Sequence, residues 1–557
     1  MNGEQLSEEE RAAVAPDLAK AARPVIVVRL GDEPWTVDQA EEILVKKAPE
    51  LSIFQRGNFI VRVIALAVKK DTPGGLRRPA GTVQLEPMSR EYLEDVFGSI
   101  IAWRKEMKRD QPDVPKVRTI ACPAFVPKIY SSRVGRWSLP VLEGFIETPV
   151  MRRDGTILSA PGYDEETGLY LKIGGDWPRV PSAPTKADAE AAMKVLREPF
   201  AQFPFVSAAD ESVFIAGILT ALQRRLLTFA PIFGFSAPAP RSGKSLLAES
   251  IAMIALGRTA PAFSVAKDRN EFRKAITATL YEGHAITNLD NVDAPLGSPD
   301  LCKALTQLIY GDRLLGATRN LSLLTNILWT ATGNNLTFKS DLSSRALRCQ
   351  IDAETERPEE RTFKIPDLLA YLLENRRRLV TAALTIQRAY WIAGRPRQNV
   401  KPWGGFDDWS RNIREPLIWL GMDDPCKTRE KIIVADPERE SNVSAGLAWY
   451  KAFANKGMRT AEVITAASDN NNNNQELREA LLAVACDWKS RSQISPDRLG
   501  MWCRSVEGRI FEGLRFSREA SRDRAVIWSV TKKDGDKKKK PDDAVPPEVP
   551  RKRKFQG

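Results

Sequence analysis

The stretch "SAPAPRSGKSLLAE" (Ser236–Glu249) decides the fold prediction. Its second half, "GKS" at 243–245 followed by an apolar helical pattern, is typical of a phosphate-binding loop, in which backbone N–H groups and a helix N-terminus face an anion. Its first half departs from that motif, because Pro238 stands where the first glycine is expected. The donors that surround a phosphate come mainly from the end of such a loop, and every residue from Arg241 onward keeps its N–H group. The stretch therefore predicts a working loop.

The surroundings of the loop support this prediction. The apolar run "FAPIFGF" before it is typical of a buried strand, and a helical pattern follows it. We predict Ser242, Gly243, Lys244 and Ser245 as nucleotide-binding residues, with Lys244 at the β- and γ-phosphates and Ser245 as a ligand of Mg²⁺. ATP and Mg²⁺ are therefore the expected cofactors.

A second motif lies in "HAITNLDNVD". It predicts an apolar strand that ends in Asp290, where a magnesium-binding carboxylate is expected. The next position, which usually holds a catalytic glutamate, is Asn291; an asparagine can orient a water molecule but cannot accept its proton. Asp293 or Glu282 could supply the base instead, and the sequence leaves both open.

Two further motifs follow in the expected order. "LTNILWTATGNN" predicts another buried strand, which ends in Asn334, placed to contact the γ-phosphate or the attacking water. "SDLSSRALRCQID" holds Arg345 and Arg348, one of which is a candidate arginine finger for the nucleotide of a neighbouring subunit; such fingers contribute on the order of 10³–10⁵ in rate. The alternation of strands and helices up to about Asp352 predicts an α/β core with a doubly wound parallel sheet.

These motifs resemble those of the phage- and poxvirus-type primase–helicases, whose motor is a superfamily 3-like AAA+ helicase. The resemblance covers roughly residues 140–530 and is most specific in 229–352. It implies a hexameric ring that hydrolyses ATP between subunits and moves along single-stranded DNA. The ATPase residues that it implies are Lys244, Ser245, Asp290, Asn334 and either Arg345 or Arg348. The N-terminal part has no histidine and no clear acidic triplet, so we expect a helicase without a primase domain, with any polymerising activity on a separate chain.

A hairpin is expected in "RLLGATRNLSLLT", where two short apolar strands flank Arg319-Asn320 as the turn. In a ring, such a hairpin would project into the central pore. Arg319 would then contact the phosphates of the translocated DNA, and an ordinary connecting hairpin is an equally weighted alternative.

The C-terminal pattern of helix, helix and two strands around the basic turn "SREASRDR" is the order of a winged helix. Its expected DNA contacts are Arg518, Arg522 and Arg524, through a helix starting near residue 495 and the wing. An interface of this kind loses affinity steeply as salt rises. A winged helix that docks onto protein is the alternative.

Composition shifts predict the following domain organisation: 1–24 a disordered lead, 25–180 an N-terminal α/β module, 181–400 the AAA+ motor with preceding helices and a helical lid, 401–468 a helical extension, 469–474 a linker, 475–531 the winged helix, and 532–557 a basic disordered tail.

Bulk composition narrows the function further. The 557 residues include only one histidine, His284, and six cysteines without a CxxC pair, which argues against a structural zinc site and against histidine-based catalysis. No apolar run is long enough for a membrane span, so we expect a cytoplasmic protein without a membrane partner. Besides a replicative helicase, two functions stay open: a helicase loader or origin-remodelling initiator that does not unwind DNA, and a DNA-binding regulator with a degenerate loop.

Overall fold

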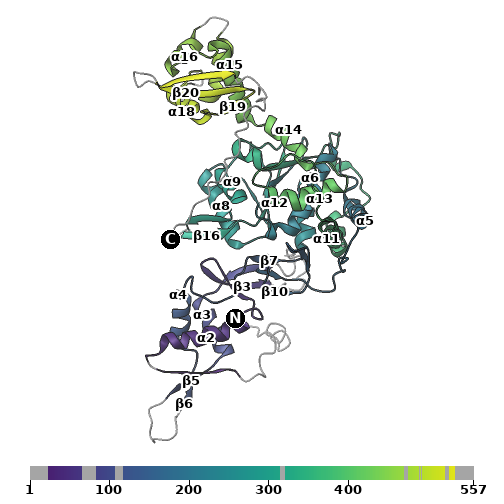
Figure 1. Cartoon of the computed structure of the whole chain (residues 1–557), viewed down its shortest axis with the longest axis vertical. Helices are drawn as coiled ribbons and strands as arrows, with labels where there is room; N and C mark the ends of the chain where they lie inside the picture. Colours follow the sequence, from purple (N-terminus) through teal and green to yellow (C-terminus); the bar gives the residue numbers. More distant parts are fainter. Residues whose placement is uncertain are drawn as a thin grey trace, which may run out of the picture. The chain divides into compact units, whose positions relative to one another are not determined.

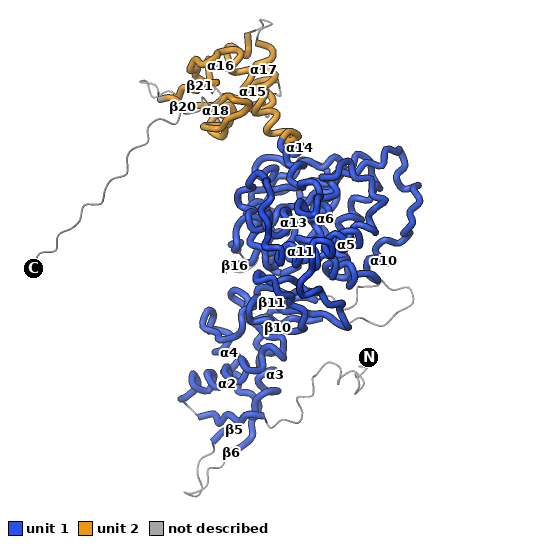
Figure 2. The backbone as a smooth tube through the Cα atoms, turned by 45° about the vertical axis from the view of Figure 1, so that its right-hand side comes forward, with its two compact units in different colours: residues 1–433 blue, residues 434–557 orange. Residues whose placement is uncertain are grey.

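The computed structural model describes residues 23–29, 31–65, 83–106, 117–313, 320–469, 474–487, 490, 492–520 and 526–532. It divides into two compact units, residues 1–433 and 434–557 (Figure 2). This division falls inside the predicted helical extension 401–468, whose second part groups with the C-terminal residues.

The first unit contains a five-stranded parallel sheet. Figure 1 labels many of the helices and strands of the chain and colours them in sequence order. The strand order of the sheet is β13 (Ala262–Ser264), β14 (Ile286–Asp290), β17 (Leu328–Asn334), β12 (Ile232–Ala237) and β18 (Ala346–Gln350). Every residue of β12 is buried, as expected for a parallel strand that is covered on both faces. The predicted α/β core with a parallel sheet is confirmed.

The register places the ends of three strands at one edge of the sheet. Ala237 at the end of β12 is paired with Asn334 at the end of β17, and Leu289, one residue before the end of β14, is paired with Ala331. Ligands of open α/β sheets bind at the carboxyl ends of the strands. The loops that follow β12, β14 and β17 therefore meet where a ligand is expected.

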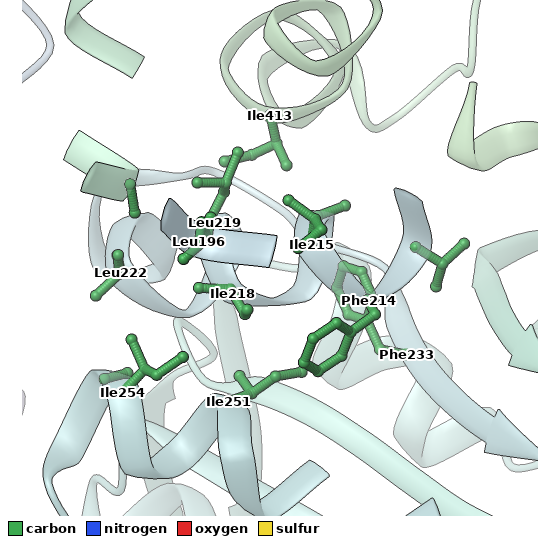
Figure 3. Close-up of a cluster of buried hydrophobic side chains, with 14 of the residues drawn as sticks. Leu196, Phe214, Ile215, Ile218, Leu219, Leu222, Phe233, Ile251, Ile254 and Ile413 are labelled. Carbon is green, nitrogen blue, oxygen red and sulfur yellow. The ribbon is translucent and has the colours of Figure 1, made fainter. Parts of the chain in front are cut away.

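The helix after β12 is held by the largest apolar core. Helix α6 (Ala208–Gln223) is buried almost all round, and Figure 3 shows its Phe214 and Ile218 facing Ile251 and Ile254 of α7 (Lys244–Leu256). Full burial of one such side chain stabilises the fold by about 1.5–3 kcal/mol. The packing fixes α7, and with it the position of Lys244 at the first residue of that helix.

The remaining helices of this unit surround the sheet or extend from it. They are α5 (Lys186–Arg197), α8 (Arg269–Glu282), α9 (Pro299–Thr306), α10 (Leu368–Glu374), α11 (Arg376–Ile392), α12 (Asp407–Trp409), α13 (Glu415–Trp419) and α14 (Thr428–Val434), the last of which crosses the unit boundary. Arg376 donates to the carbonyl oxygens of Ile254 and Ala255, so a cation caps the C-terminal end of α7.

The N-terminal part of the same unit combines helices with small sheets. Its elements are β1 (Val25–Val28), α2 (Glu33–Lys47), β2 (Ile53–Arg56), β3 (Phe59–Ala65), β4 (Val83–Pro87), α3 (Arg90–Ile100), β5 (Ala102–Glu106), β6 (Val117–Thr119), α4 (Phe125–Ser132), β7 (Gly144–Ile146), β8 (Val150–Met151), β9 (Ile157–Leu158), β10 (Gly162–Asp164) and β11 (Leu169–Leu171). The sheets that matter below are β1-β5-β6 and β2-β3-β4. An α/β composition was expected for this part.

A buried ion pair holds the segment that follows α11. The guanidinium of Arg414 is almost fully buried and makes two parallel hydrogen bonds to Asp424, at 2.8 and 2.6 Å. Burial raises the pKa of Asp424, but the hydrogen bonds from Arg414 and from the backbone of Cys426 outweigh it and hold that pKa below its usual value.

We expect Asp424→Asn to lower the free energy of unfolding by about 3–5 kcal/mol, because the change leaves the charge of Arg414 buried without its partner. Since the folded-state pKa of Asp424 is lowered, the wild-type pair stabilises the protein at neutral pH and this contribution is lost as the pH falls through the lowered pKa. Urea unfolding at several pH values measures both effects. The neighbouring Asp423→Asn is the control, because Asp423 forms an exposed pair with Lys427 that is worth less than about 1 kcal/mol. Equal effects of the two changes would contradict the prediction.

The second unit is a separate helical and β structure. It contains α15 (Pro437–Phe453), α16 (Thr460–Ser468), α17 (Gln475–Ala485), α18 (Pro496–Val506), β19 (Ile510–Phe511), β20 (Leu514–Ala520) and β21 (Val526–Lys532). The predicted order of helix, helix and strands is present, and β19 adds a third strand to the sheet. Helix α15 also belongs to the core of this unit, because its Trp449 contacts Trp502 and Phe516. The predicted boundary at 475 therefore omits helices that belong to this unit.

Candidate nucleotide-binding site

The loop between β12 and α7 closes on itself. Arg241 and Gly243 both have positive φ, 56° and 96°, so the chain turns sharply before the helix begins. Ser242 Oγ donates to the carbonyl oxygen of Ala239 at 2.7 Å, and Lys244 Nζ donates to the same oxygen at 2.9 Å. Lys244 is 8% exposed, and this burial lowers the pKa of its ammonium group. The lysine thus lies across a compact turn at a helix N-terminus, the arrangement that binds phosphate.

Two observations favour glycine at position 243. Its φ of 96° lies in a region that other residues rarely adopt. A Cβ atom there would also lie 3.1 Å from Cε1 of Phe203. Phe203 therefore packs directly against the loop, and the sequence analysis did not single it out. The aromatic-rich stretch "PFAQFPF" at 199–205, just before α6, was the available signal.

The end of β14 is tied to β17. Thr332 Oγ1 donates to Asp290 Oδ1 at 2.6 Å and accepts a hydrogen bond from the backbone N–H of Asn291 at 3.3 Å. Asn291 has a φ of 50°, a left-handed conformation in which asparagine is enriched. The backbone thus gives a reason for asparagine where a glutamate was expected, and the Thr332 hydroxyl orients the Asp290 carboxylate.

Of the two bases left open by the sequence, only one lies at the correct edge of the sheet. Glu282 precedes β14 and lies at the end of that strand opposite to Asp290. Its carboxylate accepts a hydrogen bond from Nε2 of His284 at 2.7 Å. It is therefore excluded for the nucleotide of its own subunit. Asp293 follows Asp290 and is exposed.

A third carboxylate, which the sequence analysis missed, lies on α7. Glu249 is half-buried and follows Ser245 by four residues, so both side chains lie on one face of the helix. Burial raises the pKa of Glu249, and the negative charge of Asp290 raises it further. The i, i+4 spacing from Ser245 could have identified it.

Asn334 is exposed at the end of β17, beside the start of the loop. The next residue, Asn335, has a φ of 45° and donates its N–H to the carbonyl oxygen of Ala237 at 3.0 Å. Ser236 Oγ accepts a hydrogen bond from the N–H of Leu336 at 3.0 Å. These bonds fix the turn after β17 against β12, which places Asn334 next to the loop.

The two candidate finger arginines lie in different places. Arg345 immediately precedes β18, whose first residue Ala346 is paired with Ile232 at the start of β12. Arg345 is thus at the edge of the sheet opposite to the loop, partly exposed and ion-paired with Asp341. Arg348 lies within β18, and its Nη1 donates to the carbonyl oxygen of Leu336 at 3.3 Å. Burial lowers the pKa of Arg348.

The predicted hairpin is present, but its turn is not where it was expected. Strands β15 (Ile309–Arg313) and β16 (Asn320–Leu324) are antiparallel, and Arg313 is paired with Asn320. Asn320 is therefore a strand residue, which corrects the prediction of a turn at Arg319-Asn320. The burial of Leu321 and Leu323 on one face fixes this register. Arg319 lies outside the described residues.

Of the arginines predicted to contact DNA in the second unit, one is described. Arg518 is exposed on β20 and paired in register with Trp528 of β21. Arg522 and Arg524 lie outside the described residues.

Two properties of the described part bear on ligands. It contains no group of three or more His, Cys, Asp or Glu residues that could hold a metal ion, and no helix in it is long and apolar enough to cross a membrane. Mg²⁺ at nucleotide sites needs only one or two protein carboxylates together with the phosphates of the substrate. A hydroxyl at Ser245 and a carboxylate at Asp290, already oriented by Thr332, fit that requirement.

Comparison with solved structures gives distant likenesses to proteins described as helicases or as the C-terminal region of NrS-1. An apo structure of the NrS-1 C-terminal region matches with a TM-score of 0.32 and 10% identity, over 88% of this chain and 98% of that one. A JCV helicase matches with a TM-score of 0.22 and 11% identity, over 42% and 67% of the two chains. The SCCmec type IV Cch active helicase matches with a TM-score of 0.24 and 12% identity, over 61% and 72%.

No protein-family model and no curated protein matches the chain. Because the TM-scores above are low, the function of this chain has to be inferred from its own residues.

Proposed function

We propose that this chain is an ATP-dependent DNA helicase of a phage or mobile genetic element, with a superfamily 3-like AAA+ motor. The observation that carries the proposal is the meeting of Lys244, Ser245, Asp290 and Asn334 at one edge of a parallel sheet. A regulator with a degenerate loop would not need a buried lysine across the turn and an oriented carboxylate beside it.

In this proposal each residue at the edge has a separate task. The N–H groups from Ser242 to Ser245 and the ammonium of Lys244 bind the β- and γ-phosphates. Ser245 and Asp290 would hold Mg²⁺, which supplies charge neutralisation on the phosphate oxygens. Asn334 orients the attacking water. The proton of that water would go to Asp293, three residues after Asp290, or to Glu249, whose pKa is raised by the charge of Asp290.

The position of Arg345 favours a ring. An arginine at the sheet edge opposite to the loop cannot reach the nucleotide of its own subunit, but it can reach that of a neighbour in a head-to-tail assembly. Heterologous contacts form a ring when the rotation between subunits closes, and we propose a homo-hexamer of this kind. Both arginines are bonded within their own chain, Arg345 to Asp341 and Arg348 to Leu336, so it is the position of Arg345 at the opposite edge of the sheet that favours it as the finger.

We propose that Phe203 forms the platform for the base of the nucleotide, because it packs against Gly243 of the loop. Hydrogen bonds to the preceding residue, Gln202, hold this stretch in place. The carbonyl oxygen of Gln202 accepts one from Arg361, and its side-chain oxygen accepts one from the backbone N–H of Lys364.

We expect Phe203→Ala to weaken ATP binding by about tenfold or more, in line with the roughly 1–3 kcal/mol that stacking of a base on an aromatic ring contributes. The rate at saturating ATP should stay the same, because Phe203 contacts no phosphate. Titration with a fluorescent ATP analogue and steady-state ATPase assays separate the two quantities. Trp35→Ala, which removes an exposed aromatic ring of the N-terminal part, is the control. A lower maximal rate with unchanged affinity would refute the role of Phe203.

Two partners complete the proposal. Single-stranded and forked DNA would pass the β15–β16 hairpin, and the second unit would contact duplex DNA through α18 and Arg518. If the affinity of the second unit for DNA did not change with the salt concentration, that result would contradict the proposed contact between this unit and duplex DNA. A primase or polymerase on a separate chain would supply primers.

Unwinding of a forked duplex with ATP is the experiment that tests the proposed function. Strand separation that requires ATP supports the helicase. ATP hydrolysis without strand separation would instead support a helicase loader or an origin-remodelling initiator.

A further inference from the structure

A small cavity lies between the N-terminal part of the first unit and the β15–β16 hairpin. It has a volume of about 160 Å³ and is bounded by the β2-β3-β4 sheet, by the end of α8 and by β16. Most of its wall is apolar; the side chains that matter here are Phe59, Val61, Leu85 and Leu323. An apolar cavity of about 150 Å³ is large enough to hold a benzene ring.

Arg56 is among the residues that line this cavity, and some of its N–H groups make no hydrogen bond within the described part of the chain. Arg56, the last residue of β2, is 8% exposed. Its Nη1 donates to the carbonyl oxygen of Tyr281 at 3.4 Å, whereas its Nε and Nη2 atoms are buried and have no hydrogen-bond partner within the described part of the chain. A buried unpaired donor costs about 1–3 kcal/mol, and more when it is charged.

The unused edge of Arg56 has a defined chemical preference. The Nε–Nη2 edge of a guanidinium presents two parallel N–H groups that match the two oxygens of a carboxylate. Three other arginines of this chain use that same edge for a carboxylate: Arg152 with Asp164, Arg197 with Glu211, and Arg414 with Asp424. The Nε–Nη2 edge of Arg56 has no such partner within the described part of the chain, and Arg56 is one of the residues that line the apolar cavity.

The charge state of Arg56 supports anion binding. Burial lowers its pKa to about 10, and the negative charge of Glu143, which also lines the cavity, acts against that shift. The guanidinium is therefore protonated at neutral pH. Glu143 would repel an incoming anion, so its removal should strengthen binding.

We propose that this cavity binds a small monocarboxylate with an apolar, ring-sized body. The carboxylate contacts the Nε–Nη2 edge of Arg56, and the body packs against Phe59, Leu85 and Leu323. Because Leu323 belongs to the hairpin and Arg56 to the N-terminal sheet, the bound molecule links the base of the hairpin to that sheet. The site is separate from the nucleotide loop and does not depend on the proposed ATPase function.

Benzoate is a suitable probe for the full-length chain. Calorimetric titration at constant ionic strength should show saturable binding, both in the wild type and in Lys244→Ala, where the loop no longer attracts anions through its lysine. Acetate, which lacks the body, and inorganic phosphate, which is not planar, should each bind at least tenfold more weakly. Absence of saturable benzoate binding, or equal binding of acetate or phosphate, would overturn the proposal.

Variants test the role of Arg56. Arg56→Lys should weaken benzoate binding at least tenfold, since an ammonium cannot present two parallel donors, whereas Arg104→Lys on the exposed face of β5 should have no effect. Glu143→Gln should strengthen binding. Unchanged affinity in Arg56→Lys, or weaker affinity in Glu143→Gln, would contradict the assignment.

A second variant tests the site independently, in case the Arg56 variant does not fold. Val61→Phe places a larger side chain on β3, the strand next to that of Arg56, and leaves Arg56 intact, so it should abolish benzoate binding without loss of the folded state by circular dichroism. In the wild type, benzoate should slow amide hydrogen exchange in 320–324, and this protection should be absent in Val61→Phe. Protection that persists in Val61→Phe would place the ligand elsewhere.

Discussion

Lys244→Ala is expected to lower the rate of ATP hydrolysis at saturating ATP by on the order of 10²–10³-fold, the usual effect of removing one preorganised donor from a developing negative charge. The ammonium of Lys244 is buried and lies across the turn, bonded to the carbonyl oxygen of Ala239. In this position it needs little reorganisation to contact the phosphates. DNA unwinding should fall by the same factor, because it depends on hydrolysis.

The fold of the loop should survive this change. The turn is also held by Gly243 and by the bond from Ser242 to Ala239, which the substitution does not touch. Lys128→Ala, at an exposed position on α4, is the control for the loss of one positive charge. If Lys244→Ala kept most of the ATPase activity, the loop would not be the site of hydrolysis, and a DNA-binding regulator with a degenerate loop would become the better proposal.

The core strands were predictable because each carries its own signal. An apolar run marks β12, β14 and β17, the last two of which end in a polar residue, and a parallel sheet brings the ends of such strands to one edge. The same reasoning could have excluded Glu282, which precedes its strand rather than following it. Sequence alone did not reveal the positive φ of Asn291, because the backbone conformation depends on the bond to Thr332 from another strand.

Other features depended on contacts between distant segments. Phe203 lies forty residues before Gly243, and only the packed structure brings the two together. The hairpin turn was misplaced because the register follows from the burial of Leu321 and Leu323, not from the turn residues themselves. Likewise, Trp449 joins the core of the second unit through ring contacts that no local pattern indicates.

Arg345→Ala is expected to lower ATP hydrolysis by on the order of 10³–10⁵-fold, the contribution of an arginine finger, while leaving ATP binding in place. The structure puts Arg345 at the sheet edge away from its own loop, so we expect its effect to cross a subunit boundary. Arg348→Ala is the matched control: Arg348 is bonded to Leu336 of its own chain and should have the smaller effect on the rate.

Mixing two inactive variants distinguishes a finger from a structural role. In a ring formed from equal amounts of Lys244→Ala and Arg345→Ala, about a quarter of the interfaces combine an intact lysine with an intact arginine if the subunits mix at random. Those interfaces should hydrolyse ATP, although neither variant does so alone. A mixture as inactive as its components would show that Arg345 acts within its own subunit or only supports the fold, and the head-to-tail ring would lose its main structural support.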